Sequence, residues 1–368
     1  MSDEVYMQYA LELAKKTIGQ TSPNPVVGAV VVKNNQIVGF GAHLYAGDAH
    51  AEVHAINMAK EHAKDATLYV TLEPCSHHGK TPPCTELIIN SGIKRVVIAT
   101  RDPNERVSGI NPLREAGIEV ETGILEKEAS DMNQPFFHYI QTKRPYITLK
   151  TATSFDGKTA TKTGESKWIT GEEARFDAHT YRHTHDAILV GVNTVITDNP
   201  SLTTRLKKGG GRNPIRIILD THLRTPPDAK VISDGQSETW IFVGKHVTEK
   251  AKQCYEKHKQ VRIIQLEEDK VHINKMLEIL GEKGVMSLFV EGGATVNGAF
   301  LQDKIFNRLV LYMAPMLIGG DAPSAFLGKG FASLTESPSL SIKKVEQLGT
   351  DLKIEAMYEG ENDVHGNY

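Results

Sequence analysis

Three residues with the chemistry of zinc ligands occur early in the chain, together with one acidic residue. His50 and Glu52 are two positions apart, Cys75 follows Pro74, and Cys84 follows a polar insert over 76–83. One histidine and two thiolates bind zinc well, and three protein ligands leave the fourth tetrahedral position open, as in catalytic sites. A water molecule held there ionises near neutral pH and becomes a nucleophile. Glu52 is placed to move protons to and from that water. The pattern therefore favours metal-assisted hydrolysis.

A structural zinc ribbon or a pair of ordinary buried cysteines is the alternative interpretation. A ribbon needs a fourth ligand at close spacing, and the remaining cysteine, Cys254, is far away in the sequence. Nearby His54, His77 or His78 could still close the site. His-x-Glu followed by Pro-Cys and a second Cys is, however, the arrangement of zinc-dependent nucleobase deaminases. The insert before Cys84 is polar and partly basic, which suits substrate binding.

Local elements must bring these residues together. A helix is predicted to begin at His50, so that both His50 and Glu52 lie in its first turn and reach its axial end, where unpaired backbone N–H groups point. A strand is predicted over 67–72, and Cys75 follows it closely. The Pro-Pro pair before Cys84 opens a second helix over 84–91, whose positive end favours a thiolate.

The surrounding pattern predicts α/β layers in both halves of the chain. In the first half we expect strands over 26–32, 37–41, 67–72, 96–100 and 118–122 and helices over 5–16, 84–91, 112–116 and 127–142. In the second half we expect strands over 146–152, 187–190, 215–219, 239–243, 262–266, 287–290 and 309–312 and helices over 172–183, 248–258 and 273–283. Because 368 residues exceed one ordinary core, we predict domains over 1–144 and 145–360, with a flexible tail over 361–368.

Composition narrows the function classes. A net charge of −3 and the lack of a dense Lys/Arg run weigh against a nucleic-acid partner. Three cysteines, two of them assigned to metal, indicate a reducing compartment without a disulfide framework. The acidic N-terminus is unlike a signal peptide, and the apolar runs are strand-length, so we expect no membrane segment and a cytoplasmic location.

The second half carries weaker signals. It contains no Gly-x-Gly-x-x-Gly fingerprint. An apolar strand runs into Gly292 and Gly293 before a helix, which suits phosphate binding at a helix N-terminus but also serves as plain turn geometry. Glu291 lies at the strand end, where α/β sites form. Arg182 and Arg205 could each grip a phosphate or form surface ion pairs. Taken singly, the glycines favour plain turn geometry and each arginine favours a surface ion pair, so the residues alone predict an α/β domain with a candidate anion site and no more.

An ordered set of motifs extends this interpretation. The first half resembles the cytidine deaminase-like zinc deaminases, and residues 3–357 resemble the bifunctional pyrimidine deaminase–reductases of riboflavin biosynthesis. The residues that carry the resemblance are Ser22-Pro23-Asn24-Pro25-Val26-Val27-Gly28, His50-Ala51-Glu52, Glu73-Pro74-Cys75-Ser76-His77-His78-Gly79-Lys80-Thr81-Pro82-Pro83-Cys84, Asp102-Pro103-Asn104, Ser154-Phe155-Asp156-Gly157-Lys158, Gly164-Glu165-Ser166-Lys167-Trp168-Ile169-Thr170, Asp198-Asn199-Pro200-Ser201-Leu202-Thr203 and Val290-Glu291-Gly292-Gly293.

The resemblance implies a cytidine deaminase-like α/β/α sandwich followed by a dihydrofolate reductase-like α/β domain. It implies one Zn²⁺ per chain, NADPH as the second cofactor, and a small pyrimidine ribose-phosphate as substrate. The first domain would deaminate 2,5-diamino-6-ribosylamino-4(3H)-pyrimidinone 5′-phosphate to 5-amino-6-(5-phosphoribosylamino)uracil and ammonia. The second would reduce the ribosyl side chain to ribityl. We expect no nucleic-acid or membrane partner and a homo-oligomer.

The resemblance also assigns residues to each site. Zinc would be held by His50, Cys75 and Cys84, with Glu52 catalytic. The pyrimidine nucleotide would be held by Asn24, His43, His77, Lys80, Asp102 and Asn104. In the reductase, the substrate would meet Ser166, Arg182, Leu202, Arg205 and Glu291. The cofactor would meet Ala152, Trp168, Thr194, Asp198, Thr221 and the loop Gly293, Ala294, Thr295, Val296 and Asn297. Lys150 and Glu291 would orient the ribose and supply the proton that the opened sugar needs. The alternative for Lys150 is a solvated strand-end amine.

The sequence departs from the family pattern after Asn104. The family commonly continues with another proline and a longer glycine-containing loop, whereas the segment over 105–110 is shortened here.

Two rival functions stay open: a deaminase of a nucleoside or tRNA with an unrelated second domain, and a non-catalytic, zinc-stabilised regulator that senses NADPH. A tRNA-binding enzyme should have a basic face and aromatic residues that stack on bases, and this composition indicates neither.

Overall fold

A computed structural model describes residues 2–76, 82–104 and 107–360. The chain divides into two compact units, Met1–Lys143 and Arg144–Tyr368. Arg144 belongs to the second unit because its guanidinium bonds Asn274 at 3.1 Å and Glu278 at 2.8 Å. The predicted tail over 361–368 lies outside the described residues. None of the helices in the described ranges is long and apolar enough to cross a bilayer.

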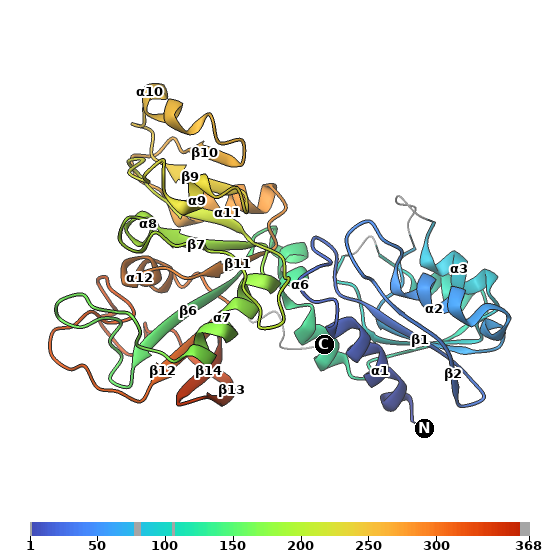
Figure 1. The fold of residues 1–368 in the computed structure, drawn as a ribbon. Coiled ribbons are helices and arrows are strands. Elements are labelled where there is room, and N and C mark those ends of the chain that lie inside the picture. The colour runs from blue at the N-terminus through green and yellow to red at the C-terminus, as the bar shows by residue number, and fades with distance from the viewer. Residues whose placement is uncertain (1, 77–81, 105–106, 361–368) are drawn as a thin grey trace. The chain divides into compact units, whose positions relative to one another are not determined.

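The N-terminal unit is built on a five-stranded sheet with the order β2-β1-β3-β4-β5. Figure 1 labels β1 and β2 of this sheet. Strand β1 is antiparallel to both of its neighbours, whereas β3, β4 and β5 are parallel. The central strands read as apolar runs because both of their faces are covered. The strands are β1 Gly28–Lys33, β2 Gln36–Ala42, β3 Thr67–Leu72, β4 Arg95–Thr100 and β5 Glu119–Thr122.

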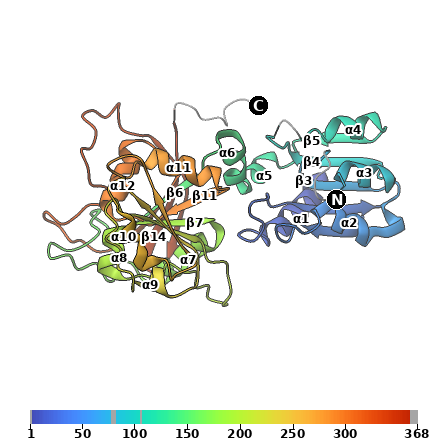
Figure 2. The ribbon, with the colours of Figure 1, turned by 90° about the horizontal axis from the view of Figure 1, so that it is seen from above.

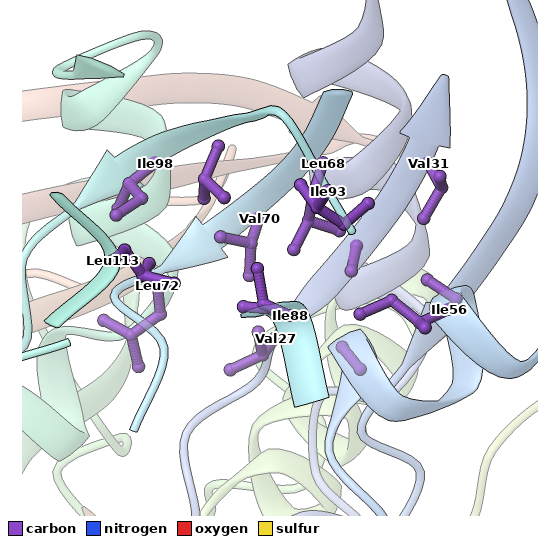
Figure 3. Close-up of a cluster of buried hydrophobic side chains, with 14 of the residues drawn as sticks. Val27, Val31, Ile56, Leu68, Val70, Leu72, Ile88, Ile93, Ile98 and Leu113 are labelled. Atoms are coloured by element: carbon purple, nitrogen blue, oxygen red, sulfur yellow. The ribbon is translucent and has the colours of Figure 1, made fainter. Parts of the chain in front are cut away.

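Helices cover both faces of this sheet. One apolar cluster joins the sheet to α1 (Asp3–Lys15) and α5 (Glu126–Met132). The cluster on the other face joins it to α2 (Ala51–Ala59), α3 (Cys84–Asn90), α4 (Ile110–Glu115) and α6 (Gln134–Thr142). Figure 3 shows the aliphatic side chains of this second cluster, with Ile88 of α3 beside Val70 of β3. A short 3-10 turn, η1 (Lys60–Ala63), follows α2. The unit is an α/β/α sandwich, as predicted.

The helix predicted over 127–142 is two helices, α5 and α6. Asn133 separates them, and its side-chain amide accepts a hydrogen bond from Val26 N (2.9 Å) and donates one to Val26 O (3.0 Å). Pro135 then lies in the first turn of α6, where a missing N–H costs nothing. The break is therefore set by a contact with the strand region, which periodicity along one segment does not reveal.

The C-terminal unit contains a nine-stranded sheet with the order β10-β9-β8-β7-β11-β6-β12-β14-β13. Strands from β10 through β12 are parallel, and β14 and β13 add an antiparallel hairpin. The strands are β6 Tyr146–Ser154, β7 Ala187–Gly191, β8 Ile215–Leu219, β9 Thr239–Val243, β10 Val261–Gln265, β11 Ser287–Val290, β12 Arg308–Ala314, β13 Leu340–Leu348 and β14 Asp351–Tyr358.

Two groups of helices sandwich this sheet (Figure 2). One cluster holds α7 (Glu172–Thr184), α8 (Val192–Asp198) and α9 (Lys230–Ser233). The opposite cluster holds α11 (Ile273–Glu282) and α12 (Ala294–Gln302). The helix predicted over 248–258 is only the short α10 (Glu249–Lys252) followed by η2 (Gln253–Tyr255). The hairpin β13–β14 was missed. The carboxyl ends of the parallel strands meet at one sheet edge, which is where α/β proteins place their sites.

Candidate functional site

The predicted zinc ligands converge in the N-terminal unit. His50 Nδ1 lies 3.2 Å from Cys84 Sγ and 3.6 Å from Cys75 Sγ, and all three donor atoms lie within 4.8 Å of one another. Zn–S bonds of about 2.3 Å and Zn–N bonds of about 2.0 Å at tetrahedral angles separate donor atoms by roughly 3.6–3.8 Å. The cluster therefore fits one zinc ion with little rearrangement.

Backbone hydrogen bonds hold the two cysteines in this arrangement. His50 is the extended residue before α2, Cys75 follows β3, and Cys84 opens α3. The backbone N–H of Cys84 donates to Cys75 Sγ at 3.3 Å, and Thr85 N donates to the Cys75 carbonyl at 3.2 Å. The start of α3 thus favours negative charge on the Cys75 sulfur.

The electrostatics of the cluster suit a cation. The hydrogen bond from the Cys84 thiol, aided by His50, lowers the pKa of Cys75 to about 4. Conversely, the bond to Cys75 raises the pKa of Cys84 above its usual range. A metal ion held by His50, Cys75 and Cys84 would replace the proton shared by the two cysteines and stabilise both thiolates. One histidine and two cysteines in this arrangement therefore favour binding of a soft ion with tetrahedral coordination, with loss of the thiol protons.

Glu52 lies in the first turn of α2, within reach of the charges of His50 and Cys75, and is 3 % exposed. Burial raises the pKa of its carboxyl, although the His50 charge opposes this shift. A carboxyl whose pKa moves toward neutrality can take up a proton and release it again at pH 7. Its place beside the metal ligands therefore fits proton transfer.

Asn24 and His43 border the same centre. Asn24 Nδ2 lies 3.0 Å from His43 Nε2, and His43 Nδ1 lies 3.1 Å from the Ala49 carbonyl. Burial lowers the pKa of His43, so its neutral ring donates from Nδ1 to Ala49 and accepts from Asn24 at Nε2. The His43 and His50 rings meet edge to face with centroids 5.7 Å apart.

Other predicted residues of this half are less defined. Asp102 Oδ1 accepts a hydrogen bond from Asn104 N at 2.8 Å, which shapes a local turn. His54 pairs with Asp48 at 3.1 Å instead of approaching the ligands. His77, His78 and Lys80 lie outside the described residues, as do two residues of the shortened segment, 105 and 106.

The remainder of the shortened segment supports the metal-binding loop. Ser108 N donates to Ser76 Oγ at 3.1 Å, and Ile110 N donates to Glu73 Oε1 at 3.2 Å. Between them, Gly109 packs so closely that a Cβ atom would lie 2.0 Å from the Pro74 carbonyl oxygen. The segment thus holds both sides of the loop that carries Cys75, a role that the sequence did not indicate.

In the C-terminal unit, Lys150, Arg182 and Glu291 gather at the carboxyl ends of the parallel strands. Arg182 on α7 donates to both carboxylate oxygens of Glu291, at 3.0 and 2.7 Å, and to the Thr203 carbonyl at 3.1 Å. Both side chains of this ion pair are nearly buried, with exposed fractions of 14 and 11 %. Glu291 follows β11, which pairs with β6 in the register Val290↔Leu149, so it extends toward Lys150 at the next position.

The charges of these three residues are coupled. Burial raises the pKa of Glu291, but the Arg182 and Lys150 charges prevail and lower it to about 2. Burial also lowers the pKa of Lys150; Glu291 opposes this shift and Arg182 adds to it. Lys150 is therefore not the solvated amine of the alternative interpretation. A lysine with a lowered pKa at a sheet edge is suited to proton donation.

The predicted cofactor residues lie on α8, on the first turn of α12, on β6 and in the loops that hold Trp168 and Thr221. Trp168 is 67 % exposed and stacks on Arg175 at 4.5 Å, and Lys167 pairs with Asp198 at 2.9 Å. Gly191 and Gly293 precede α8 and α12, and a Cβ at Gly191 would lie 3.0 Å from the Val296 side chain on α12. The first turn of a helix has unpaired backbone N–H groups, which suit an anionic ligand.

The other predicted reductase residues vary in their surroundings. Leu202 is buried, while Ser166 and Arg205 are exposed, and the Arg205 backbone N–H donates to His179 Nδ1 at 3.2 Å. Thr221 follows β8, and its hydroxyl accepts from Val271 N at 3.4 Å. The predicted loop residues Gly293, Ala294, Thr295, Val296 and Asn297 form the start of α12, Thr194 lies within α8, and Ala152 lies on β6.

Several residues that contact this site were not predicted from the sequence. Thr203 supplies the carbonyl that binds Arg182, and His179 binds the following segment. Burial, with the charges of Arg182 and a second arginine, lowers the pKa of His179 to about 4. The signal that could have found His179 is its position on the same helix as Arg182, one turn earlier.

Comparisons with known proteins cover both halves of the chain. Residues 1–100 match the family model of the cytidine and deoxycytidylate deaminase zinc-binding region, and residues 145–354 match that of the RibD C-terminal domain. The chain is 54 % identical to the riboflavin biosynthesis protein RibD of Bacillus amyloliquefaciens, over 96 % of each chain. It is 40 % identical to RibD of Escherichia coli K12, over 96 % of this chain and 98 % of the relative.

Solved structures give the same result. Acinetobacter baumannii RibD, form 1, superposes with a TM-score of 0.88 at 36 % identity, covering 97 % of this chain and 99 % of that chain. A Thermotoga maritima diaminohydroxyphosphoribosylaminopyrimidine deaminase/5-amino-6-(5-phosphoribosylamino)uracil reductase superposes with a TM-score of 0.86 at 38 % identity, covering 96 and 98 %. These similarities extend through both units.

Proposed function

Because this chain belongs to the RibD family of bifunctional riboflavin biosynthesis proteins, we propose which of its residues perform the deamination and the reduction. It combines a zinc-binding, cytidine deaminase-like domain with an NADPH-dependent, dihydrofolate reductase-like domain, as predicted. The rival functions, a deaminase with an unrelated second domain and a non-catalytic regulator, are not supported, since the second half matches the RibD C-terminal domain. The observation that carries the assignment is the His50, Cys75 and Cys84 cluster beside buried Glu52.

In the deaminase, His50, Cys75 and Cys84 hold the zinc ion, which when bound lowers the pKa of water to near neutrality. Glu52 accepts one proton of the attacking water and delivers it to the pyrimidine ring nitrogen, and then carries the second proton, from the hydroxyl added to the ring carbon, to the departing amino group. The water oxygen becomes the ring carbonyl and the 2-amino group leaves as ammonia. The buried position of Glu52 supports this role, because a raised pKa lets one carboxyl serve as base and then as acid.

Asn24 and His43 are proposed to bind the pyrimidine, since they line the centre and already share a hydrogen bond. Asp102 and Asn104 are proposed to hold the ribose phosphate, together with His77 and Lys80. Both ring nitrogens of the neutral His43 are already hydrogen-bonded, so His43 fixes the orientation of the Asn24 amide. An amide of fixed orientation discriminates a pyrimidine amino group from a carbonyl oxygen.

Glu52→Gln tests the deaminase half. The amide keeps the shape of the side chain but cannot carry the proton, so ammonia release should fall by about 10²–10⁴-fold. Zinc content should stay at one per chain, because the ligands are unchanged. Matched Glu61→Gln, on the exposed η1 turn, should behave as the wild type. Normal ammonia release by Glu52→Gln would refute the assignment.

In the reductase, NADPH supplies a hydride when bound. We propose that Lys150 donates a proton to the sugar oxygen as the ring opens, and that Glu291 and Arg182 orient the sugar. Ser166, Leu202 and Arg205 are the remaining proposed substrate contacts. The cofactor is proposed to bind Ala152, Trp168, Thr194, Asp198, Thr221 and Gly293, Ala294, Thr295, Val296 and Asn297. The glycines that precede α8 and α12 and the exposed Trp168 support this surface.

Lys150→Met tests the reductase half. With the deaminated pyrimidine as substrate, NADPH oxidation followed by absorbance should fall by about 10²-fold or more. Ammonia release should be unchanged, which controls for protein quality. Lys250→Met, at an exposed position on α10, is the matched control. Wild-type NADPH oxidation by Lys150→Met would eliminate Lys150 as the proton donor.

We also propose a homo-oligomer in a reducing, cytoplasmic environment. Edge strand β13 exposes aliphatic side chains, with Ile342 64 % and Val345 56 % exposed, which suits association. The three cysteines are all free thiols, as expected in a reducing compartment. Sedimentation equilibrium should give more than one chain per particle, and cell fractionation should recover the protein with cytoplasmic markers.

A further inference from the structure

A row of side chains crosses four strands on the sheet face that α7 covers. The register places Tyr312 of β12 opposite Ala152 of β6 on one side and Lys353 of β14 on the other, and it places Glu346 of β13 opposite Lys353. Lys150 of β6 lies opposite Val310, which is two residues before Tyr312 on β12. Because residues two apart on a strand share a face, Lys150 and Tyr312 are diagonal neighbours.

Tyr312 presents its ring to the Lys150 ammonium. Lys150 Nζ lies 5.7 Å from the centroid of the Tyr312 ring. That distance is within the range of a cation–π interaction, which is stronger where water is excluded. Tyr312 itself is 1 % exposed, so its ring has no other orientation available without displacing the core.

The Tyr312 hydroxyl is anchored from two elements. It donates to Asp177 Oδ2 on α7 at 2.6 Å, and the same oxygen pairs with Lys353 Nζ at 2.8 Å. Lys353 also pairs with Glu346 at 3.1 Å and Glu355 at 3.2 Å, and its side chain is 6 % exposed. A buried lysine with three carboxylates is held in one position, so it fixes Asp177 and through it the ring.

The same helix carries Arg182, which binds Glu291 on the other side of Lys150. The hairpin also fixes the start of α7, because Asp351 Oδ2 accepts from Gly171 N at 2.6 Å. Lys150 is therefore enclosed between a carboxylate that α7 positions through Arg182 and an aromatic ring that α7 positions through Asp177. One rigid helix sets both distances.

We propose that Tyr312, fixed by Asp177 and Lys353, is a positioning residue for the reduction, holding the Lys150 ammonium against the Glu291 carboxylate. This inference rests on the proposed role of Lys150 as proton donor. The three residues act through Lys150 and do not contact the substrate themselves. Their network makes the C-terminal hairpin part of the reductase site, although β13 and β14 carry none of the residues proposed to bind substrate or cofactor.

Tyr312→Leu, which removes the ring, is the principal test, with the full-length enzyme, NADPH and the deaminated pyrimidine. The kcat for reduction should fall by about tenfold, while KM for NADPH should change by less than about twofold, since the ring acts on Lys150. The charged groups facing Lys150 are Glu291 from β11 and Arg182 from α7. With these unchanged, loss of the ring destabilises the ammonium, so the basic limb of the pH profile should move to lower pH by about one unit.

Three further variants separate positioning from stability. Tyr312→Phe keeps the ring but loses its anchor, so its kcat should lie between those of Tyr312→Leu and the wild type, and Asp177→Asn should resemble Tyr312→Phe. Tyr255→Phe removes another buried hydroxyl of the same domain, which donates to the Thr225 carbonyl, and should leave kcat and the pH profile unchanged. Ammonia release should be unaffected in every variant, because it belongs to the other unit.

Two outcomes would overturn the inference. If Tyr312→Leu keeps the wild-type basic limb, or loses activity only in proportion to its loss of folded protein, the ring does not position Lys150. If Lys150→Met retains wild-type reduction, the proposed role of Lys150 fails and the inference fails with it. If Lys150→Met is inactive while Tyr312→Leu behaves as the wild type, the inference about Tyr312 is rejected and the proposed role of Lys150 stands.

Discussion

Replacing Glu291 by glutamine should destabilise the C-terminal unit by about 3 kcal/mol at pH 7. The change leaves Arg182 nearly buried without its counter-ion, and breaking such a pair from one side costs roughly 3–5 kcal/mol. The pKa of Glu291 gives an independent value. It is lowered from 4.5 to about 2, and at 1.36 kcal/mol per unit this is about 3.4 kcal/mol. The two routes agree.

The sign of the pH dependence follows from the lowered pKa. The folded state holds Glu291 ionised below the pH at which the unfolded chain takes up its proton, so the contribution is complete above pH 4.5 and is lost toward pH 2. By the same calculation, Glu291 contributes about 1.4 kcal/mol to the free energy of unfolding at pH 3. The stability difference between the wild type and Glu291→Gln should therefore shrink as the pH falls below 4.5.

Tryptophan fluorescence during urea unfolding measures this difference cleanly. Both tryptophans of the chain, Trp168 and Trp240, lie in the C-terminal unit, so the emission follows that unit alone. Glu249→Gln, whose side chain is 85 % exposed in a surface ion pair, should change stability by less than about 0.5 kcal/mol. Equal stability of Glu291→Gln and wild type at pH 7, or a difference that persists unchanged at pH 3, would refute the reasoning.

Three other perturbations have defined outcomes. Cys84→Ser, or treatment with a strong chelator, should lower the zinc content measured by mass spectrometry from one per chain toward none. Ammonia release should be abolished while NADPH oxidation persists, and retained zinc in the variant would refute Cys84 as a ligand. Gly109→Ala should speed zinc loss to a chelator, because its Cβ would lie 2.0 Å from the Pro74 carbonyl; wild-type kinetics of zinc release would contradict this. Burial lowers the pKa of His185 to about 4, so the unfolded chain binds its proton first and stability should fall between pH 6.5 and 4; His185→Gln should flatten that slope, and an unaltered slope would disprove it.

The metal centre could be predicted because its parts are local. His50 immediately precedes α2 instead of lying in its first turn as predicted, whereas Glu52 does lie there; Cys75 follows a strand and Cys84 opens a helix, so short-range patterns bring all four close. The support by Gly109 could not be predicted. It depends on the close approach of two loops, and nothing in the residue types around position 109 indicates that contact.

The reductase site shows a different limit. Lys150, Arg182 and Glu291 were identified with the help of family motifs, but the network of Tyr312, Asp177 and Lys353 follows from sheet order. Strand β13 was missed because a bulge between Ile342 and Lys344 shifts its alternation, so its apolar residues do not repeat every second position. In β14 the charged residues face the core, where binary patterning expects apolar ones.

The position of β14 (Asp351–Tyr358) in the sheet has a consequence for shortened gene products. This final strand lies against β12, whose other neighbour, β6, is the first strand of the unit. A nonsense codon at position 351 would spare every zinc ligand yet delete Lys353. Cells with such an allele would still release ammonia but accumulate the unreduced pyrimidine, and a separate copy of the second half should relieve their vitamin requirement.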